Sequence, residues 1–171
     1  MLHIYCGNGK GKTTAALGLA VRTLGHGKSA YLAQFLKSDV SGELLFFADV
    51  PNMTILPNPD RIKFIFQMSE EEKLQCRADC TARFHRMVQD VEEKQPFLVI
   101  LDELLDVTEC GMLAEEELLA FLRQHATQRE IVLTGRRYTP ALEELAHYIT
   151  RMDKVKHPFD QGQSGRKGVE Y

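Results

Sequence analysis

Gly7-Asn8-Gly9-Lys10-Gly11-Lys12-Thr13-Thr14 is the stretch of this sequence that decides the fold. It follows a short apolar run over residues 2–6 and precedes a helical pattern over residues 13–24. Glycines let the backbone N–H groups of such a loop converge on an anion, and the start of the following helix adds its positive end. A strand, a glycine-rich loop and a helix in this order predict a phosphate-binding loop.

The polar residues of the loop carry the expected phosphate and metal chemistry. Lys12 would place a positive charge against phosphate oxygens, and the Thr13 hydroxyl could bind Mg²⁺. Cys6 departs from the common pattern, which has a glycine at this position. The alternative is a glycine-rich turn that binds no ligand. The expected nucleotide-binding residues of the loop are Gly7, Asn8, Gly9, Lys10, Gly11, Lys12, Thr13 and Thr14.

Two acids, Asp102 and Glu103, follow an uninterrupted apolar run at residues 97–101. Such a run is typical of a central parallel strand that is covered on both faces. Open α/β sheets bind their ligands beyond the carboxyl ends of the strands. We therefore expect Asp102 or Glu103 to hold Mg²⁺, directly or through water, with a solvated strand end as the alternative. Arg136 and Arg137 follow another strand pattern at the same edge, where either could bind phosphate or ribose or lie on the surface.

The rest of the chain alternates apolar runs with helical patterns. Ser69 and Glu72 fit the reciprocal cap at the start of a long helix. This alternation predicts right-handed crossovers and a mostly parallel, doubly wound α/β sheet flanked by helices, as in the P-loop NTPases of the RecA-like type. Residues 37–58 give no clear pattern. The predicted strands are 2–6, 29–36, 97–101, 130–134 and 148–152, and the predicted helices are 13–24, 69–94, 114–125 and 140–146.

Length and composition limit the class of protein. The 171 residues suit a single domain over 1–171, and 44% hydrophobic with 26% charged residues are ordinary values for a globular chain. A net charge of -3 gives no global reason to expect nucleic acid. The sequence contains no apolar run near the ~20 residues of a membrane span and no signal-peptide pattern. We expect a cytoplasmic protein without a membrane partner, its four cysteines reduced.

Residues 153–171 have little periodicity and many turn-forming residues. A frayed terminus is the usual interpretation of such a segment, and composition alone favours it. The combination of Pro158 with glycines and charged residues also suits a loop that folds over a ligand.

The sequence resembles the ATP:corrinoid adenosyltransferases of the CobA/CobO/BtuR type in blocks that span nearly the whole chain. The phosphate loop alone would be shared with many NTPases, whereas the last three blocks are far more specific to this family. In order, the blocks after the loop are Gln34-Phe35-Leu36-Lys37, Gly42-Glu43, Gln67-Met68-Ser69, Leu101-Asp102-Glu103-Leu104, Leu133-Thr134-Gly135-Arg136, Lys156-His157-Pro158-Phe159 and Lys167-Gly168-Val169-Glu170-Tyr171.

The resemblance implies transfer of the 5′-deoxyadenosyl group of ATP to the cobalt of a reduced corrinoid, with release of triphosphate. It implies Mg²⁺ or Mn²⁺, an electron donor that reduces cobalt, a homodimer, and ATP held in an inverted sense so that C5′ is presented. It makes residues 153–171 a tail that covers the ligand. The roles that it implies are catalysis by Lys12 and Glu103, nucleotide binding by the loop and Arg136, metal binding by Thr13, Asp102 and Glu103, and corrinoid binding by Phe64, Phe66, Lys156 and His157.

Two residues depart from the family pattern. The position before the first loop glycine is usually threonine and is Cys6 here, and a Phe-x-Trp segment near the corrinoid is Phe64-Ile65-Phe66 in this chain, which has no tryptophan. The second departure concerns the lower face of the corrin. The alternative functions are a P-loop ATPase or kinase that releases ADP, and a module that binds nucleotide or corrinoid without catalysis.

Overall fold

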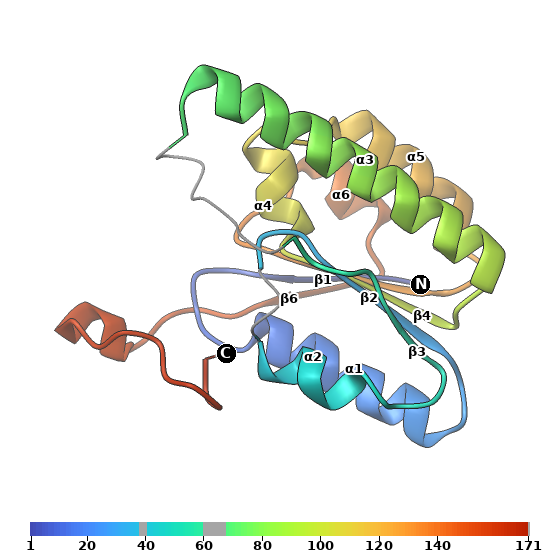
Figure 1. Cartoon of the computed structure of the whole chain (residues 1–171), viewed down its shortest axis with the longest axis horizontal. Helices are drawn as coiled ribbons and strands as arrows, with labels where there is room; N and C mark the ends of the chain where they lie inside the picture. The colour runs from blue at the N-terminus through green and yellow to red at the C-terminus, as the bar shows by residue number, and fades with distance from the viewer. Residues whose placement is uncertain (38–40, 60–67, 171) are drawn as a thin grey trace.

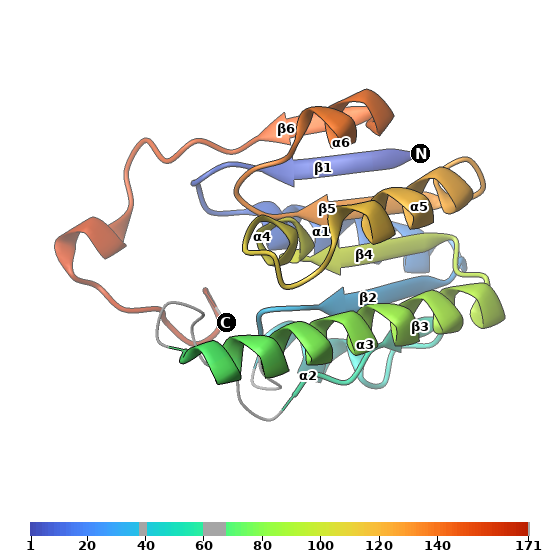
Figure 2. The ribbon, with the colours of Figure 1, turned by 90° about the horizontal axis from the view of Figure 1, so that it is seen from above.

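The parallel sheet is the centre of the computed structural model, which describes residues 1–37, 41–59 and 68–170. Within these residues six strands form one sheet in the order β3-β2-β4-β5-β1-β6, and every neighbouring pair is parallel. All strands therefore end at the same edge (Figure 2). The strands are β1 (Leu2–Cys6), β2 (Ala30–Gln34), β3 (Met53–Ile55), β4 (Leu98–Asp102), β5 (Glu130–Thr134) and β6 (Tyr148–Arg151).

Helices cover both faces of this sheet (Figure 1). α1 (Lys12–Gly25) and α2 (Gly42–Phe47) lie on one face. The other face carries α3 (Glu70–Lys94), α4 (Leu104–Glu109), α5 (Glu115–His125) and α6 (Pro140–Leu145). The predicted doubly wound α/β architecture is thus confirmed, and the sheet is parallel throughout its described strands.

The apolar run of β4 is uninterrupted because each of its faces meets a separate core. Val99 and Leu101 belong to the core under α3, α4 and α5, whereas Leu98 and Ile100 belong to the core under α1 and α2. All four side chains are fully buried. Since neighbouring side chains of a strand point to opposite faces, a strand between two helix layers needs apolar residues at every position.

All nine predicted strands and helices are present, with ends that differ by at most two residues from the prediction. The reciprocal cap at the start of α3 is confirmed, because the Glu72 N–H donates to Ser69 Oγ at 3.2 Å and the Ser69 N–H donates to Glu72 Oε2 at 2.8 Å. The sequence did not predict α2, β3 or α4. These elements span six, three and six residues, which is too short for a periodic pattern to stand out.

The C-terminal segment leaves β6, extends away from the sheet and returns towards the phosphate loop (Figures 1 and 2). It contains a single 3₁₀ turn at Pro158–Gln161. Side chains of residues 158–170 are exposed, and neither apolar core includes any of them. No helix in the described part of the chain is long and apolar enough to cross a bilayer.

Candidate nucleotide and metal site

The phosphate loop connects the end of β1 to the start of α1 and is anchored to neighbouring strand ends. The Gly7 N–H donates to the Arg136 carbonyl at 3.0 Å, and the Gly9 N–H donates to the Met152 carbonyl at 2.7 Å. A Cβ at Gly9 would lie 2.7 Å from that same carbonyl oxygen, so a side chain would force the loop away from β6. Gly7 and Gly11 have φ values of 104° and 115°, which favour glycine. The glycines thus serve the packing of the loop as well as anion binding.

Lys12, the first residue of α1, turns back over the loop. Its ammonium donates to the carbonyl oxygens of Gly7 and Gly9, both at 2.8 Å. The side chain therefore lies at the start of the helix, where the positive end of the helix dipole would also attract an anion. A phosphate chain in the loop would meet this ammonium together with the loop N–H groups.

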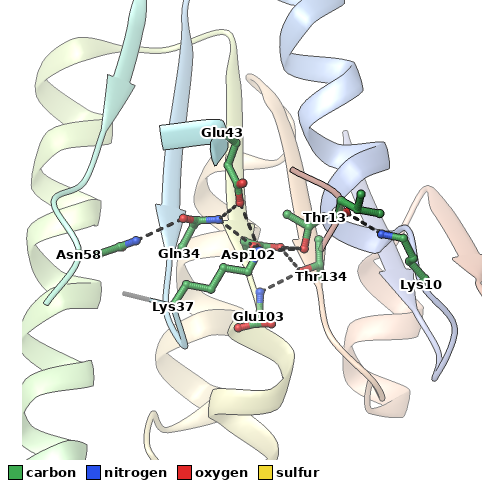
Figure 3. Close-up of polar contacts among 10 residues, drawn as sticks. Lys10, Thr13, Gln34, Lys37, Glu43, Asn58, Asp102, Glu103 and Thr134 are labelled. Atoms are coloured by element: carbon green, nitrogen blue, oxygen red, sulfur yellow. Dashed lines mark hydrogen bonds and ion pairs between the residues drawn. The ribbon is translucent and has the colours of Figure 1, made fainter. Parts of the chain in front are cut away.

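Asp102, the last residue of β4, is fully buried and is the centre of a polar cluster (Figure 3). Its Oδ1 accepts from the hydroxyls of Thr13 at 2.9 Å and Thr134 at 2.7 Å. Its Oδ2 accepts from Gln34 Nε2 at 3.2 Å and lies 2.9 Å from Lys37 Nζ. Residues from α1, β2 and β5 therefore converge on one carboxylate, as expected where parallel strands end together.

Lys37 and Glu43 extend this cluster on the side of α2 (Figure 3). The Lys37 ammonium lies 3.4 Å from Glu43 Oε1, and Gln34 Nε2 donates to the same oxygen at 2.9 Å. Burial alone would lower the pKa of Lys37, but the carboxylates of Asp102, Glu103 and Glu43 raise it above its ordinary value. Burial would raise the pKa of Glu43, but hydrogen bonds from its own backbone N–H and from Gln34, with the charge of Lys37, lower it. Both groups are therefore charged at neutral pH.

Glu103 occupies a sharp turn between β4 and α4. Its φ of 62° is in the left-handed region, and its N–H donates to Thr134 Oγ1 at 2.8 Å. Burial, followed by the charge of Asp102, raises the pKa of Glu103 to about 7, although Lys37 opposes this shift. When no cation is bound, this carboxyl group therefore takes up a proton at higher pH than an ordinary glutamate does.

Replacing Glu103 by glutamine is expected to stabilise the metal-free protein above pH 7 by up to about 3 kcal/mol, since each pKa unit between the folded and unfolded states is worth about 1.4 kcal/mol. The folded pKa is raised above the ordinary value of 4.5, so folded wild type binds a proton that the unfolded chain releases. Wild type therefore loses stability as the pH rises from 4.5 to about 7, whereas the glutamine variant does not.

Denaturant unfolding in EDTA between about pH 4 and about pH 9 measures this difference. Glu116→Gln, at an exposed position of α5, is the matched control. A stability difference between Glu103→Gln and wild type that does not change with pH would contradict the assignment of this carboxyl.

A cavity of about 550 Å³ lies between the loop and the C-terminal segment. Its volume is within the range of about 300–1,000 Å³ found for small-molecule sites. Loop residues, Lys37, Glu43 and Glu103 line one side, and His157 and Gly168 to Glu170 line the other. The cavity thus combines a cationic loop with acids that could hold a metal.

The family model of ATP:corrinoid adenosyltransferase BtuR/CobO/CobP matches residues 1–171. The chain belongs to this family. The corrinoid adenosyltransferase of Pseudomonas aeruginosa is 32% identical over the whole chain and 83% of its own length, and that of Escherichia coli K12 is 30% identical over the whole chain and 85% of its own length. A KaiC-like protein from Pyrococcus horikoshii, PH0186, has a TM-score of 0.59 at 15% identity, with 91% of this chain and 74% of that one covered. This last similarity supports the P-loop fold alone.

The structure brings together most of the residues expected of an ATP:corrinoid adenosyltransferase site. The loop, Lys12, Thr13, Asp102 and Glu103 share one edge of the sheet, and all but Asp102 and Gly7 line the cavity. His157 lines it as well, whereas Arg136 and Lys156 are exposed and outside the described lining. The Arg136 backbone N–H donates to Asp106 Oδ1 at 3.0 Å. Phe64 and Phe66 lie outside the described residues.

Four site residues of this adenosyltransferase were not assigned a role from the sequence: Gln34, Lys37, Glu43 and Thr134. Gln34 is the residue that a sequence signal could have identified, because it is a polar residue at the end of an apolar strand. In the sheet it pairs in register with Asp102. Its Oε1 accepts from Asn58 Nδ2 at 3.2 Å, which fixes the amide orientation. Lys37 and Glu43 flank a segment without a clear pattern, so no signal placed them near the acids.

The oxygen donors at this edge fit Mg²⁺ bound together with a nucleotide. In the described part of the chain, no group of three or more His, Cys, Asp or Glu residues could hold a metal. Mg²⁺ usually takes one or two carboxylates and completes its coordination with phosphates and water. Thr13 with Asp102 provides such an incomplete set, and the Lys37 ammonium occupies the position of a cation next to both.

The two acids are not equivalent in this arrangement. The Thr13 hydroxyl donates to Asp102, whereas no hydrogen bond joins Thr13 to Glu103 within the described residues. Glu103 lines the cavity instead. Asp102 is thus placed next to the threonine of the loop, and Glu103 faces the space that a nucleotide would occupy.

Proposed function

We propose that this protein transfers the 5′-deoxyadenosyl group of ATP to the cobalt(I) of a reduced corrinoid, cob(I)yrinic acid a,c-diamide or cob(I)alamin, and releases triphosphate. The observation that carries the proposal is a phosphate loop that opens onto a cavity of about 550 Å³, in a chain whose whole length matches the corrinoid adenosyltransferase family. Both substrates would meet above the carboxyl edge of the sheet.

The reaction needs little chemistry from the protein. Cobalt(I) supplies the electron pair that forms the cobalt–C5′ bond, and the C5′–oxygen bond breaks with its pair remaining on triphosphate. The attacking atom belongs to the corrinoid, so no nucleophilic side chain or general base is required. The protein has to place C5′ next to cobalt and stabilise the charge of the leaving group.

Each group at the site has a defined role in this account. Lys12 and the loop N–H groups bind the phosphate chain and stabilise the charge that develops as it leaves. Thr13, Asp102 and Glu103 hold Mg²⁺ or Mn²⁺, which neutralises phosphate oxygens. Arg136 contributes to nucleotide binding next to the loop. ATP lies in the inverted sense, so that C5′ is presented and the γ-phosphate is not.

The remaining assignments concern the corrinoid and other partners. Phe64, Phe66, Lys156 and His157 contact the corrinoid, and the chain acts as a single domain whose tail, residues 153–171, covers the ligands. The protein works as a homodimer together with an electron donor that reduces cobalt. Among these groups, the position of His157 in the cavity lining supports a role for the tail.

Replacing Phe66 by tryptophan is expected to raise activity on complete cobalamin roughly 2- to 10-fold, the equivalent of an aromatic contact of about 0.5–1.5 kcal/mol. Displacing the lower ligand of cobalt needs bulk and apolar contact on that face of the corrin, and tryptophan offers more of both than phenylalanine. Activity on corrinoids without a bound lower base, such as cobinamide, should change little. Rates of wild type, Phe66→Trp and Phe66→Ala on both corrinoids test this, and an equal effect on all corrinoids would contradict it.

Analysis of the phosphorus products tests the proposed function. Under anaerobic conditions, ATP with reduced cobinamide, cobalamin or cobyrinic acid diamide should give triphosphate as the phosphorus product. ADP or orthophosphate formed without a corrinoid would indicate a P-loop ATPase or kinase instead. Binding without turnover of any corrinoid would indicate a carrier or regulatory module.

A further inference from the structure

The ammonium of Lys37 lies among three oxygen atoms at the edge of the cavity (Figure 3). They are Asp102 Oδ2 at 2.9 Å, Thr13 Oγ1 at 3.3 Å and Glu43 Oε1 at 3.4 Å. A carboxylate and the loop threonine are also the groups that would hold Mg²⁺. The lysine therefore occupies the region that a divalent cation needs.

The buried negative charge of Asp102 favours a cation in this region. Asp102 is fully buried, and a buried carboxylate without a counter-charge is strongly destabilising. Glu43 and Glu103 add negative charge on the side of the cavity. The hydrogen bonds that Asp102 accepts leave its charge without a counter-ion, and Lys37 supplies one while no metal is bound.

The position and length of the Lys37 side chain allow its ammonium to move away from Asp102. Lys37 follows the end of β2 by three residues, and its charge sits on a flexible four-carbon stem. Its side chain is 23% exposed and lines the cavity, whereas the Asp102 side chain is inaccessible. The ammonium can thus move into the cavity while the carboxylate stays in place.

We propose that Lys37 is an exchangeable occupant of the divalent-cation position. Its ammonium neutralises Asp102 while the site holds no nucleotide, leaves Asp102 and Thr13 when a metal–nucleotide complex enters, and then faces the phosphate chain in the same cavity. This inference rests on the metal role of Thr13 and Asp102 under the proposed function. It adds a positioning residue that favours the metal–nucleotide complex over free metal, because free metal must displace the lysine without offering it a phosphate.

The competing interpretation is a permanent ion pair that only braces Asp102. Lys37→Met separates the two interpretations, because it removes the charge and keeps the length of the side chain. A displaced competitor predicts tighter binding of free divalent cation by this variant, whereas a permanent brace predicts unchanged or weaker binding.

The direct test is a titration of Mn²⁺ followed by electron paramagnetic resonance, with neither nucleotide nor corrinoid present. Lys37→Met is expected to bind Mn²⁺ at least about tenfold more tightly than wild type, which corresponds to about 1.4 kcal/mol. Lys28→Met is the matched control, because it removes the same charge at the opposite end of β2, where Lys28 lies over the Phe97 ring. It should bind Mn²⁺ as wild type does.

Thermal unfolding provides the second measurement. Lys37→Met should be less stable than wild type in EDTA, because Asp102 loses its counter-charge, and Mg²⁺ should restore more stability to the variant than it adds to wild type. Mn²⁺ affinity that is no tighter in Lys37→Met would overturn the proposal, as would a variant that stays unfolded in millimolar Mg²⁺. Neither measurement uses adenosylation, so a failure of the proposed reaction and a failure of the lysine exchange are distinguishable.

Discussion

Replacing Lys12 by alanine is expected to lower kcat/KM for adenosylation at least about 100-fold, or about 2.7 kcal/mol of transition-state stabilisation, the low end for a missing charge-stabilising donor. Its ammonium lies over the loop between the carbonyls of Gly7 and Gly9, where the phosphate chain would bind. Initial rates with ATP and reduced corrinoid measure the loss. Circular dichroism should remain that of wild type, since the side chain is outside both apolar cores.

Lys10 provides the contrast on the same loop. Its ammonium donates to the Val169 carbonyl at 2.8 Å and lies 3.9 Å from Glu170, so it faces the tail in the absence of ligand. Lys10→Ala should therefore cost less than Lys12→Ala. Near wild-type adenosylation by Lys12→Ala, or a larger loss in Lys10→Ala, would contradict the role assigned to Lys12.

Deletion of residues 156–171 is expected to reduce turnover more than about 100-fold while the fold remains, because we propose that this segment covers the ligands, excludes water and completes the site. The tail lines the cavity through His157 and Gly168 to Glu170, and neither apolar core includes any residue of 156–170. The truncated chain should therefore lose its turnover, while its thermal unfolding temperature shows that most of the stability is retained.

Hydrogen exchange gives an independent test of whether the tail covers the ligands. Backbone exchange in residues 158–170 should slow when ATP and a corrinoid are added together. Glu170→Gln is the matched control, because it weakens the ion pairs with Arg166 and Lys10 and leaves the chain intact. Exchange that is unchanged by ligands, with full activity of the truncated chain, would make the segment a frayed terminus.

The sequence predicts this fold well where a local signal is strong. The phosphate loop needs glycines for its φ values and for its close approach to β6, so it is visible as a motif. The run before Asp102 is visible because β4 is covered on both faces. The helix α3 has both a periodic pattern and a capping box at its start.

The polar cluster around Asp102 is harder to predict, because its members come from α1, α2, β2, β4, β5 and the segment after β2. Lys37 and Glu43 are six residues apart in a segment without a periodic pattern, and they reach Asp102 through contacts between separate elements: Lys37 pairs with Asp102, and Glu43 pairs with Lys37. Likewise, the composition of the tail favours fraying. Its contacts with Lys10 of the loop are made by the Val169 carbonyl and the Glu170 side chain, and neither contact could be predicted from composition. Long-range contacts of this kind leave no pattern in the local sequence.

The most direct test of the account tracks the carbon atom that should move. ATP labelled with carbon-13 at C5′ is incubated anaerobically with the protein, Mg²⁺ and a cobalt(I) corrinoid, and the corrinoid and phosphate products are examined by NMR. The label should appear on carbon bound to cobalt, with one triphosphate released for each corrinoid adenosylated. Label that remains in ADP or ATP, with no cobalt–carbon bond formed, would contradict it.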